Sequence, residues 1–444
     1  TGPSGSSSIS RSAGMFANFN YSWDNRYLID LTGRIDGSSN FASKQRSAPF
    51  WSAGVRWNIY NEKFMKTHGW FENLAVRANI GTVGNQNFQL SQIMTLYNFL
   101  KMYDGVMGAE IMSIANPELK WQTTLNRNIG LEFSLLQGLV NLDFNYYSNI
   151  TKNNLTDIAI LPSTGFSTYK ANMGKVRNQG YEFSLSITPI KKNGWIVNAF
   201  VNGAHNKNKL LNISDALRDY NEVIKENQTA HLNYAGYTQL ERIFLFEEGQ
   251  SLNSIFAVRS MGIDPGTGQE IFVTADGVQT FQWNAADQVV VGNTEPTLKG
   301  YFGLNVDYKR WSFGANFQYS FGADRYNKTL YEKIEGGNFA QNADRRALTQ
   351  RWTKPGDVAK YRGYGNTSQL KPTSRFVQKD DFLSMTSARL SYTLNANDLQ
   401  SLGISLLKFT LSTNDLFYVS TIKQERGLSY PFARTFYFSL QANF

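Results

Sequence analysis

Apolar and polar residues alternate strictly over several segments of this chain. From Thr435 to Phe444, Phe, Leu or Ala occupies every second position, and Thr, Tyr, Ser, Gln or Asn stands between them. A period of two places successive side chains on opposite faces of a β-strand. The pattern therefore predicts long strands with one apolar and one polar face. Four further segments show it clearly: 49–59, 140–150, 179–189 and 311–321.

Composition leaves two classes of β-protein open. The chain holds 31 Phe, 23 Tyr and 9 Trp among 444 residues, yet no apolar run approaches the length of a transmembrane helix. A large soluble β-protein fits these observations. An outer-membrane β-barrel fits them equally, since a tilted strand of about ten residues crosses a bilayer. Periodicity alone does not separate the two classes.

Connection lengths favour the barrel. Alternation predicts fourteen strands: 12–22, 27–36, 49–59, 74–83, 123–136, 140–150, 179–189, 195–205, 253–262, 298–308, 311–321, 382–394, 406–415 and 435–444. Short connections at 23–26, 137–139, 190–194 and 309–310 alternate with long ones at 84–122, 151–178, 206–252 and 322–380. This alternation is typical of an antiparallel up-and-down barrel with tight periplasmic turns and long extracellular loops.

Segment 263–297 breaks the alternation, because it stands where a short turn belongs. Its strand-like part, 269–275, gives a fifteenth strand and restores the order. Closed bacterial barrels contain an even number of strands. Either the count is wrong by one, or 1–444 is part of a barrel. The first ten residues lack the basic and apolar regions of a signal peptide, which favours the second interpretation.

The sequence offers no constellation for catalysis, metal or cofactor binding. Cys is absent, and the three His, at 68, 205 and 231, are far apart. No nucleophile elbow, P-loop or dinucleotide motif occurs. Asp264 to Glu270 suggests a tight turn more strongly than a calcium loop. We therefore expect a protein that is not an enzyme.

Charge and aromatic placement refine this picture. The net charge is +9, but runs of basic residues are only two long, which argues against nucleic acid as a partner. Arg127 falls on the apolar face of 123–136, so we expect it near a membrane interface, where such a charge costs about 0–1 kcal/mol. Aromatic residues near strand ends suggest an interfacial girdle or, alternatively, substrate platforms: Trp23, Trp51, Trp57, Trp195, Trp311 and Tyr437.

Ordered motifs give the chain a family resemblance. They run nearly end to end: Leu31 to Phe41, Asn61 to Phe64, Arg77 to Gln86, Asn116 to Thr124, Asn172 to Glu182, Ser374 to Val377, Leu383 to Met385, Thr413 to Phe417 and Tyr430-Pro431. In their order and spacing they resemble the C-terminal half of SusC-like (SusC/RagA-type) TonB-dependent transporters of Bacteroidetes outer membranes. Gln122 stands where the family pattern has Glu.

This resemblance implies an architecture. The chain would be the C-terminal part of an integral outer-membrane barrel, contributing about 15 of about 22 strands. The plug domain and signal peptide would lie outside 1–444. The terminal aromatic residues would act as an assembly signal for barrel insertion: Phe436, Phe438 and Phe444.

The resemblance also implies a function. A SusD-like surface lipoprotein would deliver an oligosaccharide or a peptide to the barrel, and TonB, contacting the missing N-terminal part, would energise nutrient uptake into the periplasm. A non-transporting scaffold subunit of a larger outer-membrane complex is the alternative. An outer-membrane enzyme or a passive porin is a third interpretation, and the missing catalytic groups count against the enzyme.

Overall fold

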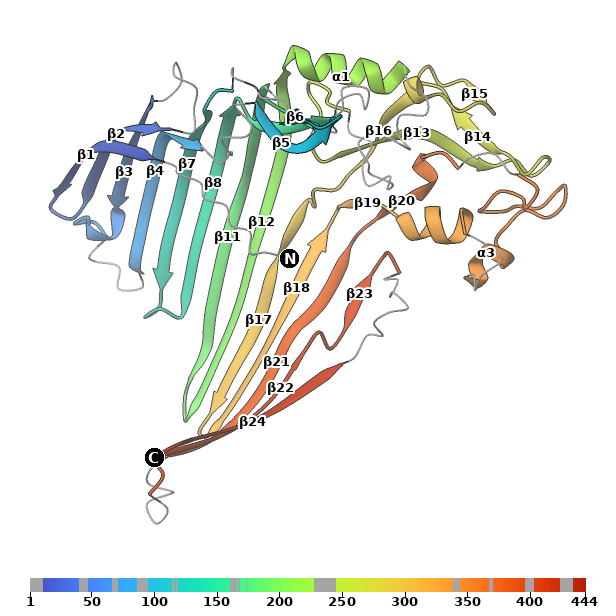
Figure 1. The fold of residues 1–444 in the computed structure, drawn as a ribbon. Coiled ribbons are helices and arrows are strands. Elements are labelled where there is room, and N and C mark those ends of the chain that lie inside the picture. The colour runs from blue at the N-terminus through green and yellow to red at the C-terminus, as the bar shows by residue number, and fades with distance from the viewer. Residues whose placement is uncertain are drawn as a thin grey trace.

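A computed structural model gives the fold (Figure 1). It describes residues 11–39, 47–65, 71–85, 95–113, 116, 119–159, 166, 168–172, 174–226, 245–337, 344–366, 370–395, 403–423 and 434–444. None of the helices within these ranges is long and apolar enough to cross a membrane.

One large antiparallel sheet forms a curved wall (Figure 1). Thirteen strands follow one another in a single path, with a fourteenth, β23, beside β21. In order they are β1 (Ser12–Trp23), β2 (Tyr27–Ser38), β3 (Ser47–Asn58), β4 (Phe71–Asn85), β7 (Gln122–Leu135), β8 (Val140–Lys152), β11 (Gly174–Lys192), β12 (Trp195–Ile213), β17 (Leu298–Tyr308), β18 (Trp311–Phe321), β21 (Phe382–Asn395), β22 (Leu406–Asn414) and β24 (Thr435–Asn443), and β23 is Tyr418–Ser420.

The prediction of fifteen wall strands is wrong by two. Segments 253–262 and 269–275 form β13 (Ser254–Ile263) and β14 (Glu270–Val273) of a separate four-stranded sheet, with β15 (Gln279–Thr280) and β16 (Gln288–Asn293). In the wall β12 pairs directly with β17. Three consecutive residues of β13 are buried, which is the pattern of a core strand and not of a strand with one exposed face. Removing two strands leaves the direction of every other strand unchanged.

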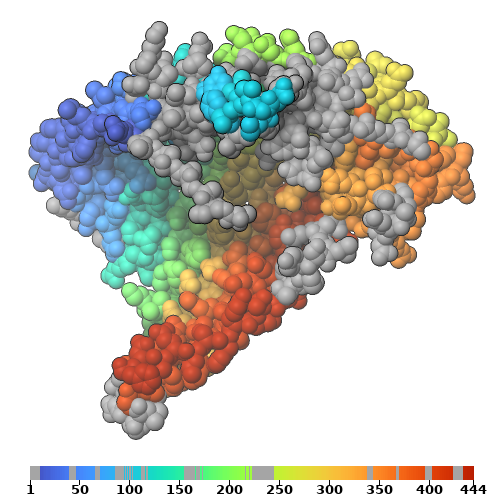
Figure 2. Space-filling view, viewed as in Figure 1, coloured from blue at the N-terminus to red at the C-terminus, as the bar shows by residue number. Residues whose placement is uncertain are grey.

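Several predicted loops contain secondary structure. Outside the wall lie the hairpins β5 (Leu96–Tyr103) with β6 (Val106–Ser113) and β9 (Leu155–Ala159) with β10 (Thr168–Asn172), the pair β19 (Asp324–Tyr326) with β20 (Val377–Lys379), and the helices α1 (Asp215–Glu226), η6 (Ala285–Asp287), η7 (Thr329–Glu335), α3 (Arg345–Thr349) and η8 (Ser374–Phe376). Figure 2 shows α1 and the β5–β6 hairpin together at one end of the molecule.

Short turns join the strands at the opposite end. Asn193 and Gly194 connect β11 to β12 with φ angles of 54° and 77°. Two residues with positive φ form the tight hairpin turn that suits the twist of paired strands. A further helix, η2 (Ile59–Asn61), follows β3 at this end. Beside it Glu62 accepts hydrogen bonds from the Tyr27 hydroxyl at 2.6 Å and the Trp57 indole at 3.0 Å.

The wall has one apolar face, which stays exposed. Its large residues come from strands across the whole sheet: Phe19, Tyr21, Leu31, Val55, Ile129, Phe144, Tyr181, Leu304, Phe313, Leu390, Leu411 and Phe438. A continuous apolar surface of this size needs a partner, and lipid supplies one. We call this surface the lipid face and the opposite, polar surface the lumen face.

Strands β11 and β12 are longer than predicted. Each contains 19 residues. At about 3.3 Å per residue they reach about 60 Å, roughly twice the hydrocarbon thickness of a bilayer. The ends that lead into the long connections therefore project beyond the membrane and carry the extramembrane elements.

Gly203 allows a close contact within the wall. It pairs with Phe183, and a Cβ at Gly203 would lie 2.6 Å from the Phe183 ring and 2.8 Å from the Tyr319 hydroxyl. We expect Gly203→Ala to destabilise the folded barrel by about 1–3 kcal/mol through overpacking. The measurement is the temperature at which the compact species of the full-length protein converts to the unfolded band on gels.

Gly33 provides the matched control, because a Cβ built there meets nothing within 4 Å. Equal shifts in the conversion temperature for Gly33→Ala and Gly203→Ala would contradict the packing argument.

Candidate functional site

Asparagine, serine and glutamine line the lumen face. Strand alternation places many Asn on it, among them Asn79, Asn128, Asn141, Asn145, Asn149, Asn178, Asn198, Asn202, Asn206, Asn208, Asn305 and Asn316. Many of these amides bond to one another or to neighbouring hydroxyl groups. Asn198, for example, donates to Ser186 Oγ at 2.9 Å and to Thr188 Oγ1 at 3.1 Å. The lumen face is therefore a dense set of neutral donors and acceptors.

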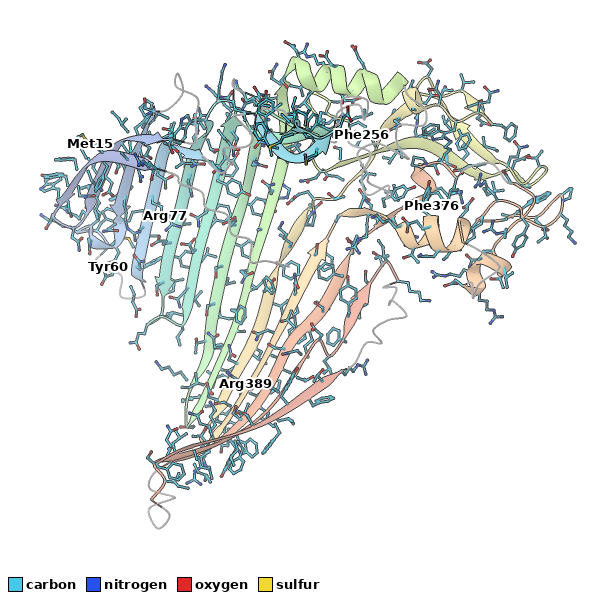
Figure 3. All side chains as sticks on the ribbon, viewed as in Figure 1. Met15, Tyr60, Arg77, Phe256, Phe376 and Arg389 are labelled. Atoms are coloured by element: carbon cyan, nitrogen blue, oxygen red, sulfur yellow. The ribbon has the colours of Figure 1, made fainter. Side chains whose placement is uncertain are left out.

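Four charged residues on this face form a paired ladder across β3, β4, β7 and β8. The Arg56 guanidinium donates to Glu132 at 2.7 Å. Arg77, labelled in Figure 3, binds the same carboxylate and reaches Asp143 at 3.1 Å and Asn145 Oδ1 at 2.7 Å. Two cations and two anions cancel, so the ladder carries no net charge.

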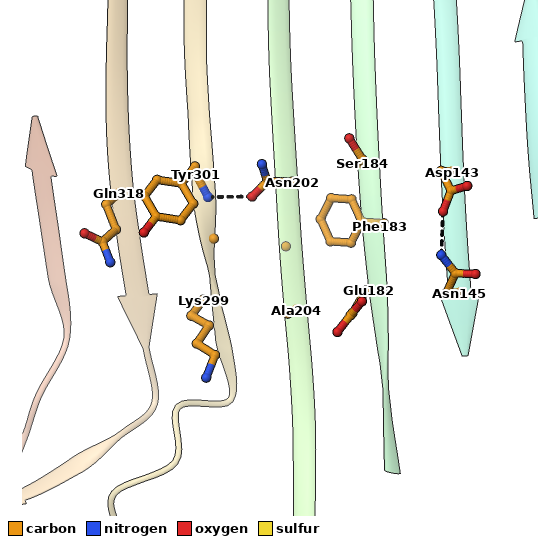
Figure 4. Close-up of a pocket in the computed structure, with 12 residues that line it drawn as sticks. Asp143, Asn145, Glu182, Phe183, Ser184, Asn202, Ala204, Lys299, Tyr301 and Gln318 are labelled. Carbon is orange, nitrogen blue, oxygen red and sulfur yellow. Dashed lines mark hydrogen bonds between the residues drawn. The ribbon is translucent and has the colours of Figure 1, made fainter. Parts of the chain in front are cut away.

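A shallow pocket lies next to the ladder on β8, β11, β12, β17 and β18 (Figure 4). Its volume is ≈ 460 Å³. Its lining combines charged, amide and aromatic groups: Asp143, Asn145, Glu182, Asn202, Lys299, Tyr301 and Gln318. Such a surface suits an uncharged or mixed-charge polar ligand.

Tyr301 and Asn202 form the centre of this pocket. The Asn202 side-chain oxygen accepts from the Tyr301 backbone N–H at 2.9 Å, and this bond does not use the amide nitrogen (Figure 4). The Tyr301 side chain is 45% exposed. An exposed aromatic ring beside hydrogen-bonding amides can stack on a sugar or a peptide group.

The long connections between wall strands build a second candidate surface, which we call the loop module (254–293, 324–337, 344–366 and 370–379). Its apolar core joins β13 to η7 and η8. Phe256, Val258 and Phe376 are almost completely buried, and the Tyr331 ring meets Phe376 edge-on at 5.2 Å. Figure 3 labels Phe256 and Phe376, which come from the two different connections.

A buried ion network locks the module. Arg375 binds Glu270 through two hydrogen bonds of 3.1 and 2.9 Å and also binds Glu335. Arg362 meets the other oxygen of Glu335 at 3.0 Å. Arg351 donates to four backbone carbonyl groups around this cluster, among them that of Glu335 at 2.9 Å. The network joins segments more than 100 residues apart in the sequence.

Burial and the neighbouring carboxylates act in opposite directions on the buried arginines. Burial alone lowers the pKa of Arg375, but the two carboxylates outweigh burial and raise it above its ordinary value. Burial likewise lowers the pKa of Arg351. At Tyr331 burial raises the pKa, so the hydroxyl stays protonated and donates to Leu370 O at 2.8 Å. Arg375 and Arg351 therefore stabilise the fold of the loop module.

Sequence reasoning missed this network. Arg375 lies in the Ser374 to Val377 motif, but nothing in the sequence pairs it with Glu270 in another connection or with Glu335, which lies 40 residues earlier in the same connection. Asp264, considered for calcium, accepts from the Thr267 hydroxyl at 2.6 Å and its backbone N–H at 3.0 Å. These bonds lower the pKa of Asp264 and fix a turn.

The predicted assembly residues lie at the end of the sheet. Phe436 and Phe438 project from the lipid face of β24 and are 62% and 70% exposed, and Phe444 follows the strand at 90%. Aromatic residues meet in pairs near the short turns, as Trp195 stacks on Tyr308 at 4.1 Å and Trp311 contacts Tyr392 at 4.7 Å. These positions are consistent with an interfacial girdle.

Comparison with known proteins gives consistent matches. The family model described as TonB dependent receptor-like, beta-barrel matches residues 2–329. TonB-dependent receptor P39 of Formosa agariphila is 28% identical over 88% of this chain and 40% of that protein. TonB-dependent receptor SusC of Bacteroides thetaiotaomicron is 27% identical over 74% of this chain and 33% of that protein.

Solved structures agree with this assignment. The structure of the RagAB peptide transporter matches with a TM-score of 0.78 and 25% identity, over 94% of this chain and 45% of that one. The chain thus spans less than half the length of the relatives it matches. Since the family model covers most of the chain and the wall exposes an apolar face, the chain belongs to the TonB-dependent receptor-like β-barrel family, and its place is in the outer membrane.

Proposed function

We propose that this chain forms the C-terminal part of the barrel of a SusC-type importer, which takes up an oligosaccharide or a peptide in a TonB-dependent manner. The lumen face carries this proposal. Its amides and the Tyr301 ring offer weak, repeated contacts to a polar ligand, and the Arg–Glu–Asp ladder removes net charge from the path. Many weak contacts favour passage over tight retention.

The rest of the protein would supply the moving parts. Barrels of this class close with about 22 strands around a plug. With thirteen wall strands here, a barrel of that size would take about nine more from the remaining sequence. The plug and the segment that contacts TonB would lie there as well. This division agrees with the greater length of the relatives.

The loop module would receive the partner. It lies at the end of the wall that carries the long connections, which we assign to the cell exterior (Figure 1). A SusD-like lipoprotein that caps the barrel needs a rigid rim to close against. The buried network around Arg375 provides such rigidity.

The importer predicts uptake that depends on the proton gradient. Cells that express the full-length protein and its lipoprotein partner should accumulate labelled ligand, and a protonophore should reduce uptake to background. Tyr301→Ala should weaken uptake about 2–10-fold through loss of an aromatic contact. Tyr146, on the lipid face and equally exposed at 46%, gives the matched control Tyr146→Ala. Entry that persists without the gradient would contradict the proposal and favour a porin.

The ion network predicts a specific weakness of the rim. Arg375→Met leaves the buried Glu270 without a cation and Glu335 with Arg362 alone, and breaking such a buried pair costs about 3–5 kcal/mol. The loop module should then become sensitive to limited proteolysis in the membrane-inserted protein while the barrel stays folded. Arg345→Met, at an exposed site in α3, is the control. Adding Glu270→Gln to Arg375→Met removes the carboxylate that lost its cation and should restore much of the resistance, and unchanged sensitivity would oppose the electrostatic cause.

The terminal phenylalanine predicts an assembly defect. If Phe444 is part of an insertion signal, Phe444→Ala should lower the amount of folded protein in the outer membrane without changing the thermal stability of the fraction that assembles. Phe313→Ala removes an aromatic ring from the lipid face in the middle of the wall and serves as the control. Equal yields for the two variants would show that Phe444 is an ordinary lipid-facing residue.

A further inference from the structure

Basic residues gather on the lipid face where β7, β8, β11 and β12 approach the long connections. There are six: Arg127, Lys152, Lys175, Arg177, Lys207 and Lys209. In β11 the side chains alternate between the two faces, and Lys175 and Arg177 stand at odd positions, as Tyr181 and Phe183 do. The strand register places the other cations on this same face. We call this group the basic rows.

The rows lie directly beyond the apolar belt. Tyr181 pairs with Tyr146 on one side and with His205 on the other, which gives an aromatic row. One step further, Gln179 pairs with Ser148 and Lys207. Along the strands toward the long connections, the lipid face therefore changes from apolar to aromatic and then to basic. A lipid leaflet changes in the same order, from its hydrocarbon core through the interface to the headgroups.

Register brings like charges face to face. Lys152 stands directly opposite Lys175, and Arg177 stands directly opposite Lys209. Like charges in such cross-strand pairs destabilise a sheet. Within the part of the chain that the structure describes, no salt bridge joins any of the six to a carboxylate. The buried Nε of Arg177 has no hydrogen-bond partner. The rows therefore lack counter-charge from the described protein.

An apolar hollow adjoins the rows at Arg127. It lies on the lipid face across β3, β4, β7 and β8, and its volume is ≈ 460 Å³. Small and branched residues form its floor, among them Ala53, Ala78 and Ile80, and Arg127 and Ser148 form its polar edge. A hollow of this kind fits an acyl chain whose headgroup reaches the arginine.

We propose that the basic rows bind the phosphorylated headgroup of an outer-leaflet lipid, with an acyl chain in the hollow beside Arg127. Phosphate supplies the missing counter-charge, and the arginines donate paired hydrogen bonds to its oxygens. The adjoining apolar hollow favours a lipid over free phosphate, because only an amphipathic ligand fills both parts. This inference rests on the barrel fold and its orientation and not on import.

The test uses lipid A, a bisphosphorylated glucosamine lipid, added to the full-length protein in detergent, with binding read by native mass spectrometry. The triple variant Arg127→Gln, Arg177→Gln, Lys209→Gln should bind lipid A about tenfold more weakly or worse. The double variant Lys191→Gln, Lys192→Gln removes two exposed cations from the short-turn end of β11 and should bind as the unmodified protein does.

Further arms separate the possible ligands. Lipid A that lacks its phosphates should bind the unmodified protein as weakly as intact lipid A binds the triple variant. Inorganic phosphate at millimolar concentration should not displace lipid A from the unmodified protein. Unchanged binding of lipid A by the triple variant, or equal binding of the dephosphorylated lipid, would overturn the proposal. The proposal would also be overturned if the triple variant no longer bound the lipoprotein partner but still bound lipid A, because the basic rows would then be a protein interface. Uptake measured in parallel tells failure of lipid binding from failure of transport.

Discussion

This structure depends on one constraint, which is that the backbone must form all its hydrogen bonds inside the hydrocarbon core of a membrane, where there is no water. Every N–H and C=O of the wall must find its partner on a neighbouring strand, because lipid offers none. The antiparallel pairing, continuous from β1 to β24, meets this demand for the strands that lie between these two edges. Once the strands are paired, alternation fixes the rest: one face meets lipid and the other meets water. The polar lumen face and the apolar lipid face are thus two consequences of one ladder.

The same ladder explains where charge is tolerated. On the lumen face, Arg56 and Arg77 sit between Glu132 and Asp143, so charges cancel within a few ångströms. In the loop module, Arg375 is held between two buried carboxylates, those of Glu270 and Glu335. Burial penalises each of these groups alone, and pairing offsets the penalty. Charge in these two regions therefore organises structure.

Much of the wall was predictable from the sequence, and the reasons are local. Alternation from Trp311 to Phe321 and from Thr435 to Phe444 identifies strands because each has one face in lipid. The strand assignment of 253–262 was equally right about conformation but wrong about place. Whether a strand joins the wall or a separate sheet depends on its partner, and pairing between β12 and β17 across 84 intervening residues (214 to 297) leaves no trace in either segment.

The sites were less predictable, for the same reason. Glu270 and Arg375 form a bidentate pair only because two connections fold over one another, and neither carries a charge pattern of its own. Arg127 is the opposite case, since its place on an apolar face was visible from alternation alone. Its neighbours Arg177 and Lys209 became meaningful only through the register that sets them opposite each other. In a barrel, then, the sequence of a strand reveals the medium each face meets, whereas the chemistry across strands emerges only when the register is known.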